Sequence, residues 1–175
     1  MTIKSGLLLV FQLVLIFVMN LFVCSLIHEI GHAIIAIACG GKISRLKLGF
    51  DAYIETKQTK YNKFTKSLMY ANGTIFPNVI ILFLLLFYKK DSMNFLYQFM
   101  YFIFFMTFIF SFIPWLIIPL LKTYPENDDV TFFIQSSQLN PLSISLVVMF
   151  ILIGAIILFV NKGMPKTFFH YLRNF

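Results

Sequence analysis

Long runs of hydrophobic residues dominate the chain and are separated by short polar stretches. The runs at about 6–38, 67–88, 94–121 and 141–160 each reach or exceed the roughly 20 residues that an α-helix needs to cross a bilayer. The pattern therefore predicts an α-helical integral membrane protein with about four transmembrane helices. No linker between the runs is long enough to separate a second domain, so we expect residues 1–175 to form a single domain.

Between the first and second runs the pattern changes from continuous hydrophobicity to alternation. In KISRLKLGFDAYIETK (42–57), apolar and polar residues alternate on both sides of Gly49, Phe50 and Asp51. Such alternation around a turn is typical of a β-hairpin. Because this segment follows the first hydrophobic run directly, we expect a short membrane-associated hairpin beside the first helix.

Two of the predicted helices contain residues that are unusual on a lipid-facing surface. NGTIFPN (72–78) interrupts the second run with asparagine, glycine and proline, and these residues should face protein or water. Pro114 and Pro119 lie near the end of the third run. Since proline removes a helix hydrogen bond, we expect a kinked or broken helix end there.

The remaining segments are short and polar. We interpret KKD (89–91) as a tight turn and KTYPENDD (122–129) as a connection, while TFFIQSSQ (131–138) is expected to form one or two helical turns. We interpret residues 162–175 as a basic tail.

Composition supports a membrane protein and argues against nucleic-acid binding. The chain is 59% hydrophobic and 12% charged, which is too apolar for a soluble domain. The net charge is +7, but half of the 14 lysines and arginines lie between Lys42 and Lys66, a pattern typical of membrane-flanking segments. No basic groove-reading motif is present, so we expect the lipid bilayer and no nucleic acid as a partner. The distribution of basic residues favours a cytoplasmic position for the hairpin.

One cluster of ionisable side chains lies inside the first predicted helix. His28, Glu29 and His32 form an H-E-x-x-H motif. Positions i and i+4 of a helix share one face, so both imidazoles can bind one metal ion. Glu29 lies about 100° round the helix, where it can act as general base on a water molecule at the metal. A carboxylate near mid-membrane costs about 2.5–3.5 kcal/mol, which indicates a functional cavity rather than helix packing.

A catalytic zinc ion needs a third protein ligand and one open position. The chain has seven acidic residues, and elimination by position leaves Glu126, Asp128 and Asp129. They lie in the connection after the third predicted helix, on the same side of the membrane as the end of the first. The remaining imidazole, His170, lies in the C-terminal segment, and we interpret it as an interfacial residue.

These motifs resemble the site-2 protease family of intramembrane zinc metalloproteases. HEIGHA (28–33) resembles that family's HExGHA, after which the family carries a membrane-associated β-sheet. NGTIFPN (72–78) resembles its Gly-Pro-x-x-Asn element, with Asn78 as the matching asparagine. FSFIP (110–114) is similar to an Asn-Leu-Leu-Pro stretch that leads to Leu-Asp-Gly, for which PENDD (125–129) is the candidate here.

The resemblance implies one Zn²⁺ per chain, held by His28, His32 and Asp128, with Asp129 in the place of the family's glycine as the alternate ligand. It implies Glu29 as the base in peptide hydrolysis and Asn78 as a group that binds substrate or the oxyanion. The implied substrates are membrane-anchored proteins, signal-peptide remnants or small peptide precursors. The Lys-, Phe- and Asn-rich composition favours a bacterial cell membrane, and we expect the active site nearer its cytoplasmic side.

Two other classes of function fit the same residues. A zinc-binding or transport membrane protein would use the histidines, although a transporter has no particular need for the non-ligand carboxylate of Glu29. A non-catalytic accessory subunit would keep the protease fold, and the irregular aspartate motif is the best argument for it.

Overall fold

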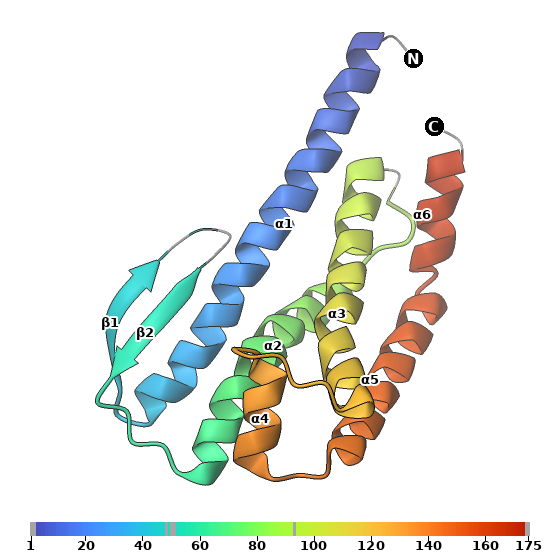
Figure 1. The fold of residues 1–175 in the computed structure, drawn as a ribbon. Coiled ribbons are helices and arrows are strands. Elements are labelled where there is room, and N and C mark those ends of the chain that lie inside the picture. Colours follow the sequence, from blue (N-terminus) through green and yellow to red (C-terminus); the bar gives the residue numbers. More distant parts are fainter. Residues whose placement is uncertain (1–2, 48, 50–51, 93, 174–175) are drawn as a thin grey trace.

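The chain folds into a bundle of helices with one β-hairpin at its side (Figure 1). The computed structural model describes residues 3–47, 49, 52–92 and 94–173. The elements in chain order are α1 (Ile3–Ala38), β1 (Lys42–Lys47), β2 (Tyr53–Lys57), α2 (Lys63–Leu86), α3 (Phe95–Leu121), α4 (Asp129–Ser137), α5 (Pro141–Asn161) and α6 (Met164–Arg173).

In the described part of the chain, α1, α2, α3 and α5 are long and apolar enough to cross a membrane. Their outer surfaces are themselves apolar: Leu7, Phe11 and Phe150 are each more than half exposed. Such surfaces are unfavourable in water and suit the hydrocarbon of a bilayer. The predicted fold class is therefore confirmed, and the protein is a multi-pass integral membrane protein.

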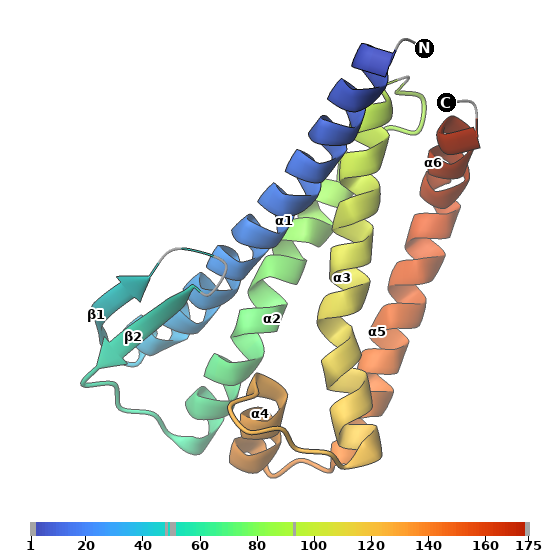
Figure 2. The same cartoon turned by 45° about the horizontal axis from the view of Figure 1, so that its top comes forward.

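The chain termini, the connections and the short helix α4 lie at the two ends of the bundle. Figures 1 and 2 show the two termini and the α2–α3 connection at one end, with α4 at the other. The hairpin lies beside the C-terminal half of α1, as predicted, and β1 pairs antiparallel with β2. Phe50 and Asp51, at the predicted hairpin tip, lie outside the described residues. Among the helices, α1 packs mainly on α2, and α3 packs mainly on α5.

Helix α2 begins earlier than the predicted 67–88 because Asn62 caps it. The Asn62 side chain accepts a hydrogen bond from the Thr65 N–H at 2.8 Å, and the Thr65 hydroxyl accepts one from the Asn62 N–H at 3.0 Å. This reciprocal pair satisfies donors that a helix start otherwise leaves free. Lys63 and Lys66 therefore lie in the first helical turns and not in the preceding connection.

The polar and helix-weakening residues of α2 face protein, as predicted. Gly73, Pro77 and Asn78 are buried, and the Asn72 side chain donates a hydrogen bond to the Gly31 carbonyl of α1 at 2.6 Å. Helix α2 runs through all of them without interruption.

Helix α3 runs through Pro114 and Pro119 to Leu121, so, of the kinked or broken end that was predicted, the break does not occur. A proline removes only one backbone hydrogen bond, and packed neighbours can hold such a membrane helix together. Close to Pro119, Ser145 of α5 donates a hydrogen bond to the Leu116 carbonyl at 3.0 Å and so links α5 to this part of α3.

The C-terminal segment, which we predicted to be a basic tail, contains helix α6. Met164 and Phe168 share one face of α6 and are buried, and the Phe168 ring stacks on Phe102 of α3 at 4.1 Å between centroids. Just before α6, the Lys162 ammonium donates hydrogen bonds at 3.1 Å to two carbonyls, those of Leu85 and Leu86. Lys162 thereby satisfies the C-terminal end of α2, where a positive charge is favourable.

Candidate metal centre

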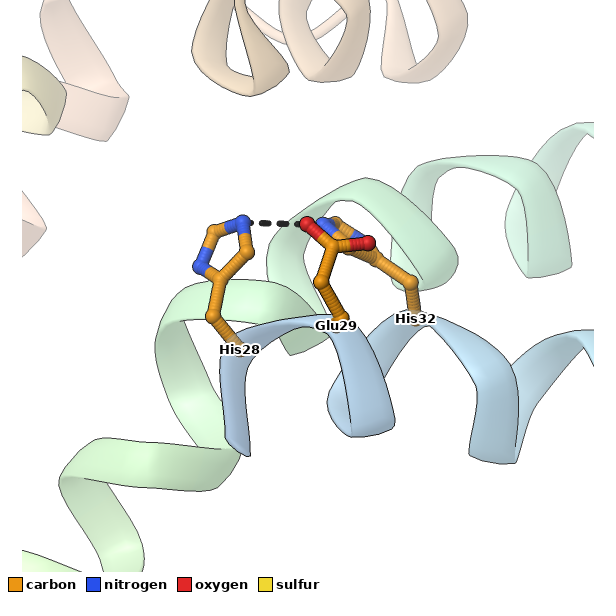
Figure 3. A group of neighbouring side chains, drawn as sticks. All are labelled: His28, Glu29 and His32. Atoms are coloured by element: carbon orange, nitrogen blue, oxygen red, sulfur yellow. Dashed lines mark hydrogen bonds between the residues drawn. The ribbon is translucent and has the colours of Figure 1, made fainter. Parts of the chain in front are cut away.

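The H-E-x-x-H side chains come from the C-terminal third of α1 and are close together (Figure 3). One potential ligand atom from each of His28, Glu29 and His32 lies within 4.8 Å of the others. The two imidazole Nε2 atoms are 3.0 Å apart. One turn of helix therefore brings both imidazoles to a common point, as the i, i+4 spacing indicates.

A backbone carbonyl of α2 orients His32. Its Nδ1 lies 2.7 Å from the Met69 carbonyl oxygen. Because a carbonyl can only accept, Nδ1 carries the hydrogen and Nε2 of the neutral ring is left with its lone pair. Fixing the tautomer in this way is how a second hydrogen bond prepares a histidine to bind a metal ion.

The third group at this point is Asp129, the first residue of α4. Its Oδ2 lies 3.0 Å from His28 Nε2 and 3.1 Å from His32 Nε2. Burial raises the pKa of the Asp129 carboxyl, but His28 and His32 in their protonated form donate hydrogen bonds and carry charge that outweigh burial and hold that pKa well below its usual range. Asp129 is therefore a carboxylate at neutral pH, the form in which it can bind a metal ion.

Asp128, the aspartate favoured from the sequence, is used differently. Its Oδ1 accepts hydrogen bonds from the N–H groups of Val130 at 2.9 Å and Thr131 at 3.1 Å, so Asp128 is the N-cap of α4. An N-cap side chain folds back over the first turn, whereas the next residue points elsewhere. Asp128 was the expected ligand and Asp129 the alternate, but in the structure Asp129, not Asp128, lies beside the imidazoles. The preference of aspartate for N-cap positions indicates from the sequence that one of the two caps α4, but it does not decide which one.

The donor set fits a zinc ion. The three atoms His28 Nε2, His32 Nε2 and Asp129 Oδ2 form a triangle with sides of 3.0, 3.0 and 3.1 Å. Donors on a tetrahedral zinc ion are about 3.3 Å apart, given bonds of about 2.0–2.2 Å. The His28 side chain is 35% exposed and that of Asp129 is 27% exposed, which leaves the open side that a catalytic site requires.

Glu29 lies beside the imidazole pair (Figure 3) and also contacts the β-hairpin. Its Oε2 accepts a hydrogen bond at 3.2 Å from the backbone N–H of Ile54 in β2. Glu29, His32 and Asp129 line a cleft of about 280 Å³ together with Ile54 and Thr56 of β2. The cleft therefore has the free edge of β2 as one wall.

Two glycines let α1 and α2 cross closely beneath this centre. A Cβ on Gly31 would overlap the Asn72 carbonyl oxygen, and a Cβ on Gly73 would overlap His32 Nε2 and lie 2.8 Å from His28 Cε1. From the sequence Gly73 was only a helix-weakening residue. The structure shows that its missing side chain makes room for both imidazoles.

Replacing Gly73 by alanine should therefore lower zinc affinity by about 10–100-fold, the usual effect of disturbing groups that orient metal ligands. Zinc per chain, measured by elemental analysis during titration with a chelator, checks this. Gly154→Ala is the matched control, because a Cβ on Gly154 in α5 meets nothing within 4 Å. Equal zinc affinity in the two variants would contradict the role given to Gly73.

Two other candidate residues lie away from the centre. The Asn78 side chain donates to the Thr74 carbonyl at 2.8 Å and to the Ser111 hydroxyl at 2.7 Å, and it lies about 140° round α2 from Gly73. It lines a separate apolar cavity of about 560 Å³ among α2, α3 and α5, so this geometry does not support an oxyanion role for it. His170 lies in α6, at the other end of the molecule (Figure 1).

A multi-pass membrane bundle with an H-E-x-x-H helix, a converging aspartate and an adjoining hairpin defines the class of site-2 protease-like membrane metallopeptidases. The chain belongs to the peptidase M50B-like family, whose model matches residues 3–157. The matched region includes the hairpin and every residue of the metal centre, and the resemblance to site-2 proteases is thereby confirmed at the level of the family. No curated protein and no solved structure matches the chain.

Proposed function

We propose that this protein is an intramembrane zinc metalloprotease that hydrolyses peptide bonds in or near transmembrane segments. The observation that carries the proposal is that Asp129 meets His28 and His32 beside Glu29, although most of the chain separates the aspartate from the other three. Family membership supports a metallopeptidase. The irregular aspartate motif, the best argument for a non-catalytic accessory subunit, loses force because Asp129 occupies the position that a third ligand needs.

In this proposal His28, His32 and Asp129 hold the zinc ion. Zinc, when bound, supplies a Lewis acid that polarises a peptide carbonyl and makes a water molecule more acidic. The Glu29 carboxylate takes a proton from the attacking water and passes it to the leaving amine as the carbon–nitrogen bond breaks. The Met69 carbonyl keeps His32 in the tautomer that binds metal, and the Asp128 cap fixes the start of α4.

The free edge of β2 suits an extended substrate. A helical transmembrane segment hides its peptide bonds, so it must unwind locally before cleavage, and an unwound segment can add to a strand edge through its backbone. Ile54 and Thr56 belong to the cleft wall, and the Ile54 N–H points into it. A substrate carbonyl pairing there would replace the hydrogen bond to Glu29. We therefore propose membrane-anchored proteins or short membrane peptides as substrates, reached from the cytoplasmic side, where the basic residues near the hairpin would lie.

Ile54→Pro should slow cleavage of a membrane-anchored substrate by about 5–10-fold, the effect of losing one backbone hydrogen bond of about 1–1.5 kcal/mol. Its zinc content should remain unchanged. The rate is followed by gel electrophoresis of a tagged substrate, with zinc measured in parallel.

Leu46→Pro provides the control for this edge. Leu46 lies opposite Ile54 in the β1–β2 register. In an antiparallel pair, two opposite residues either both point their backbone N–H groups toward the partner strand or both point them away from it. The Leu46 N–H therefore points to the outer edge, away from the cleft, where proline is tolerated. Equal slowing by both prolines would show hairpin damage and not loss of substrate pairing.

A further inference from the structure

Helix α6 has one face that fixes it to the bundle. Met164, Phe168 and Tyr171 are spaced at i, i+4 and i+7, so they share this face. Met164 and Phe168 are buried, and the Tyr171 hydroxyl donates a hydrogen bond to the Ser92 carbonyl of the α2–α3 connection at 3.3 Å. This face therefore holds α6 in a fixed orientation at this end of the molecule, and the rest of its surface falls into two further faces.

The second face of α6 is apolar and exposed. Phe169 and Leu172 lie on it and are 56% and 53% exposed. A short helix with one apolar face and one basic face, placed directly after a transmembrane span, is typical of the membrane interface. The apolar face can enter the acyl-chain boundary while the rest of α6 stays at the level of the lipid headgroups.

The third face is basic and borders a cleft. Lys166, His170 and Arg173 are again spaced at i, i+4 and i+7 and are exposed. Across the cleft, which has a volume of about 630 Å³, are Lys90 and Asp91 of the α2–α3 connection. Three permanently positive side chains thus face a single carboxylate.

These charges are not balanced by the protein around them. Among the residues that the structure describes, Lys90, Lys166 and Arg173 form no ion pair with a carboxylate. Lys162, by contrast, is occupied by the end of α2. The cleft therefore offers uncompensated cationic donors of a kind that binds phosphate oxygens.

We propose that the cleft between α6 and the α2–α3 connection binds the phosphate headgroup of an anionic phospholipid. The basic face meets the phosphate, and the neighbouring face with Phe169 and Leu172 contacts the acyl chains of the same lipid. A soluble phosphate would match only the basic half of this surface, whereas a lipid matches both halves. The proposal is independent of the protease activity and of zinc.

The test is native mass spectrometry of the full-length protein in detergent, titrated with phosphatidylglycerol or with phosphatidylcholine of the same acyl chains. The wild type should bind phosphatidylglycerol about tenfold more tightly or better, because each basic residue near a membrane surface adds to the attraction. The triple variant Lys90→Gln, Lys166→Gln, Arg173→Gln should lose this preference. The paired change Lys166→Arg with Arg173→Lys should keep it.

A second triple variant, Lys42→Gln, Lys57→Gln, Lys60→Gln, removes the same charge at the hairpin end and should retain the preference. Equal losses in the two triple variants would mean a general charge effect and would overturn the proposal. It would also be overturned if the wild type showed no preference, or if millimolar inorganic phosphate displaced phosphatidylglycerol completely, since a soluble anion would then be the ligand.

Discussion

Asp129→Ala is expected to lower the zinc content of the detergent-purified protein from about one ion per chain to nearly none, because a three-ligand site that loses its carboxylate keeps only two imidazoles. Asp128→Ala is expected to keep the zinc and to lose about 0.5–2 kcal/mol of stability, the usual effect of removing an N-cap. Elemental analysis measures the first effect, and the thermal unfolding midpoint measures the second.

Asp128→Ser separates ligand binding from capping in this experiment. Serine is a good N-cap but lacks the carboxylate, so this variant should keep both the zinc and the unfolding midpoint. If Asp128→Ser lost its zinc while Asp129→Ala kept it, Asp128 would be the ligand after all, and α4 would have to begin differently when zinc binds.

Glu29→Gln is expected to reduce cleavage by about 10²–10⁴-fold while leaving zinc bound, since general acid–base catalysis contributes that much. The glutamine carbonyl can still accept the hydrogen bond from the Ile54 N–H, so the position of β2 should not change. The measurement is the cleavage rate of a tagged membrane-anchored protein by wild type and variant in the same vesicles, with zinc content determined on both.

His32→Ala is the reference for loss of the whole centre, because it should lose zinc and cleavage together. Full activity in Glu29→Gln would remove Glu29 from the mechanism. A wild type that binds zinc but cleaves no membrane protein or peptide would favour the zinc-binding or transport function.

The four spans and the H-E-x-x-H cluster could be predicted because both depend on local periodicity. A long apolar run is enough to indicate a span, and the spacing of His28 and His32 already places them on one helix face. The choice between Asp128 and Asp129 depended on where α4 begins, and a shift of one residue exchanges a cap for a metal-facing carboxylate. The exact residue at which a helix begins or ends is the feature that a sequence defines least precisely.

Other features depend on contacts between distant segments. The packing of Gly73 against the imidazoles arises from the crossing of α1 and α2, which the sequence does not specify. Asn78 was assigned by similarity of a motif, but the face of α2 on which it lies is set by α3 and Ser111. The three faces of α6 could have been recognised from the spacing of its residues, but residues 162–175 were interpreted only as a basic tail.

The hydrogen bonds from Lys162 to the Leu85 and Leu86 carbonyls have a practical consequence for shortened chains. A chain truncated before Lys162 would leave these carbonyls without their ammonium partner. Helix α2 carries Gly73 against the imidazoles, and a loosened end would allow it to slide along α1. Truncations meant to remove α6 alone should therefore stop after Lys162, so that a loss of zinc is not mistaken for an effect of α6.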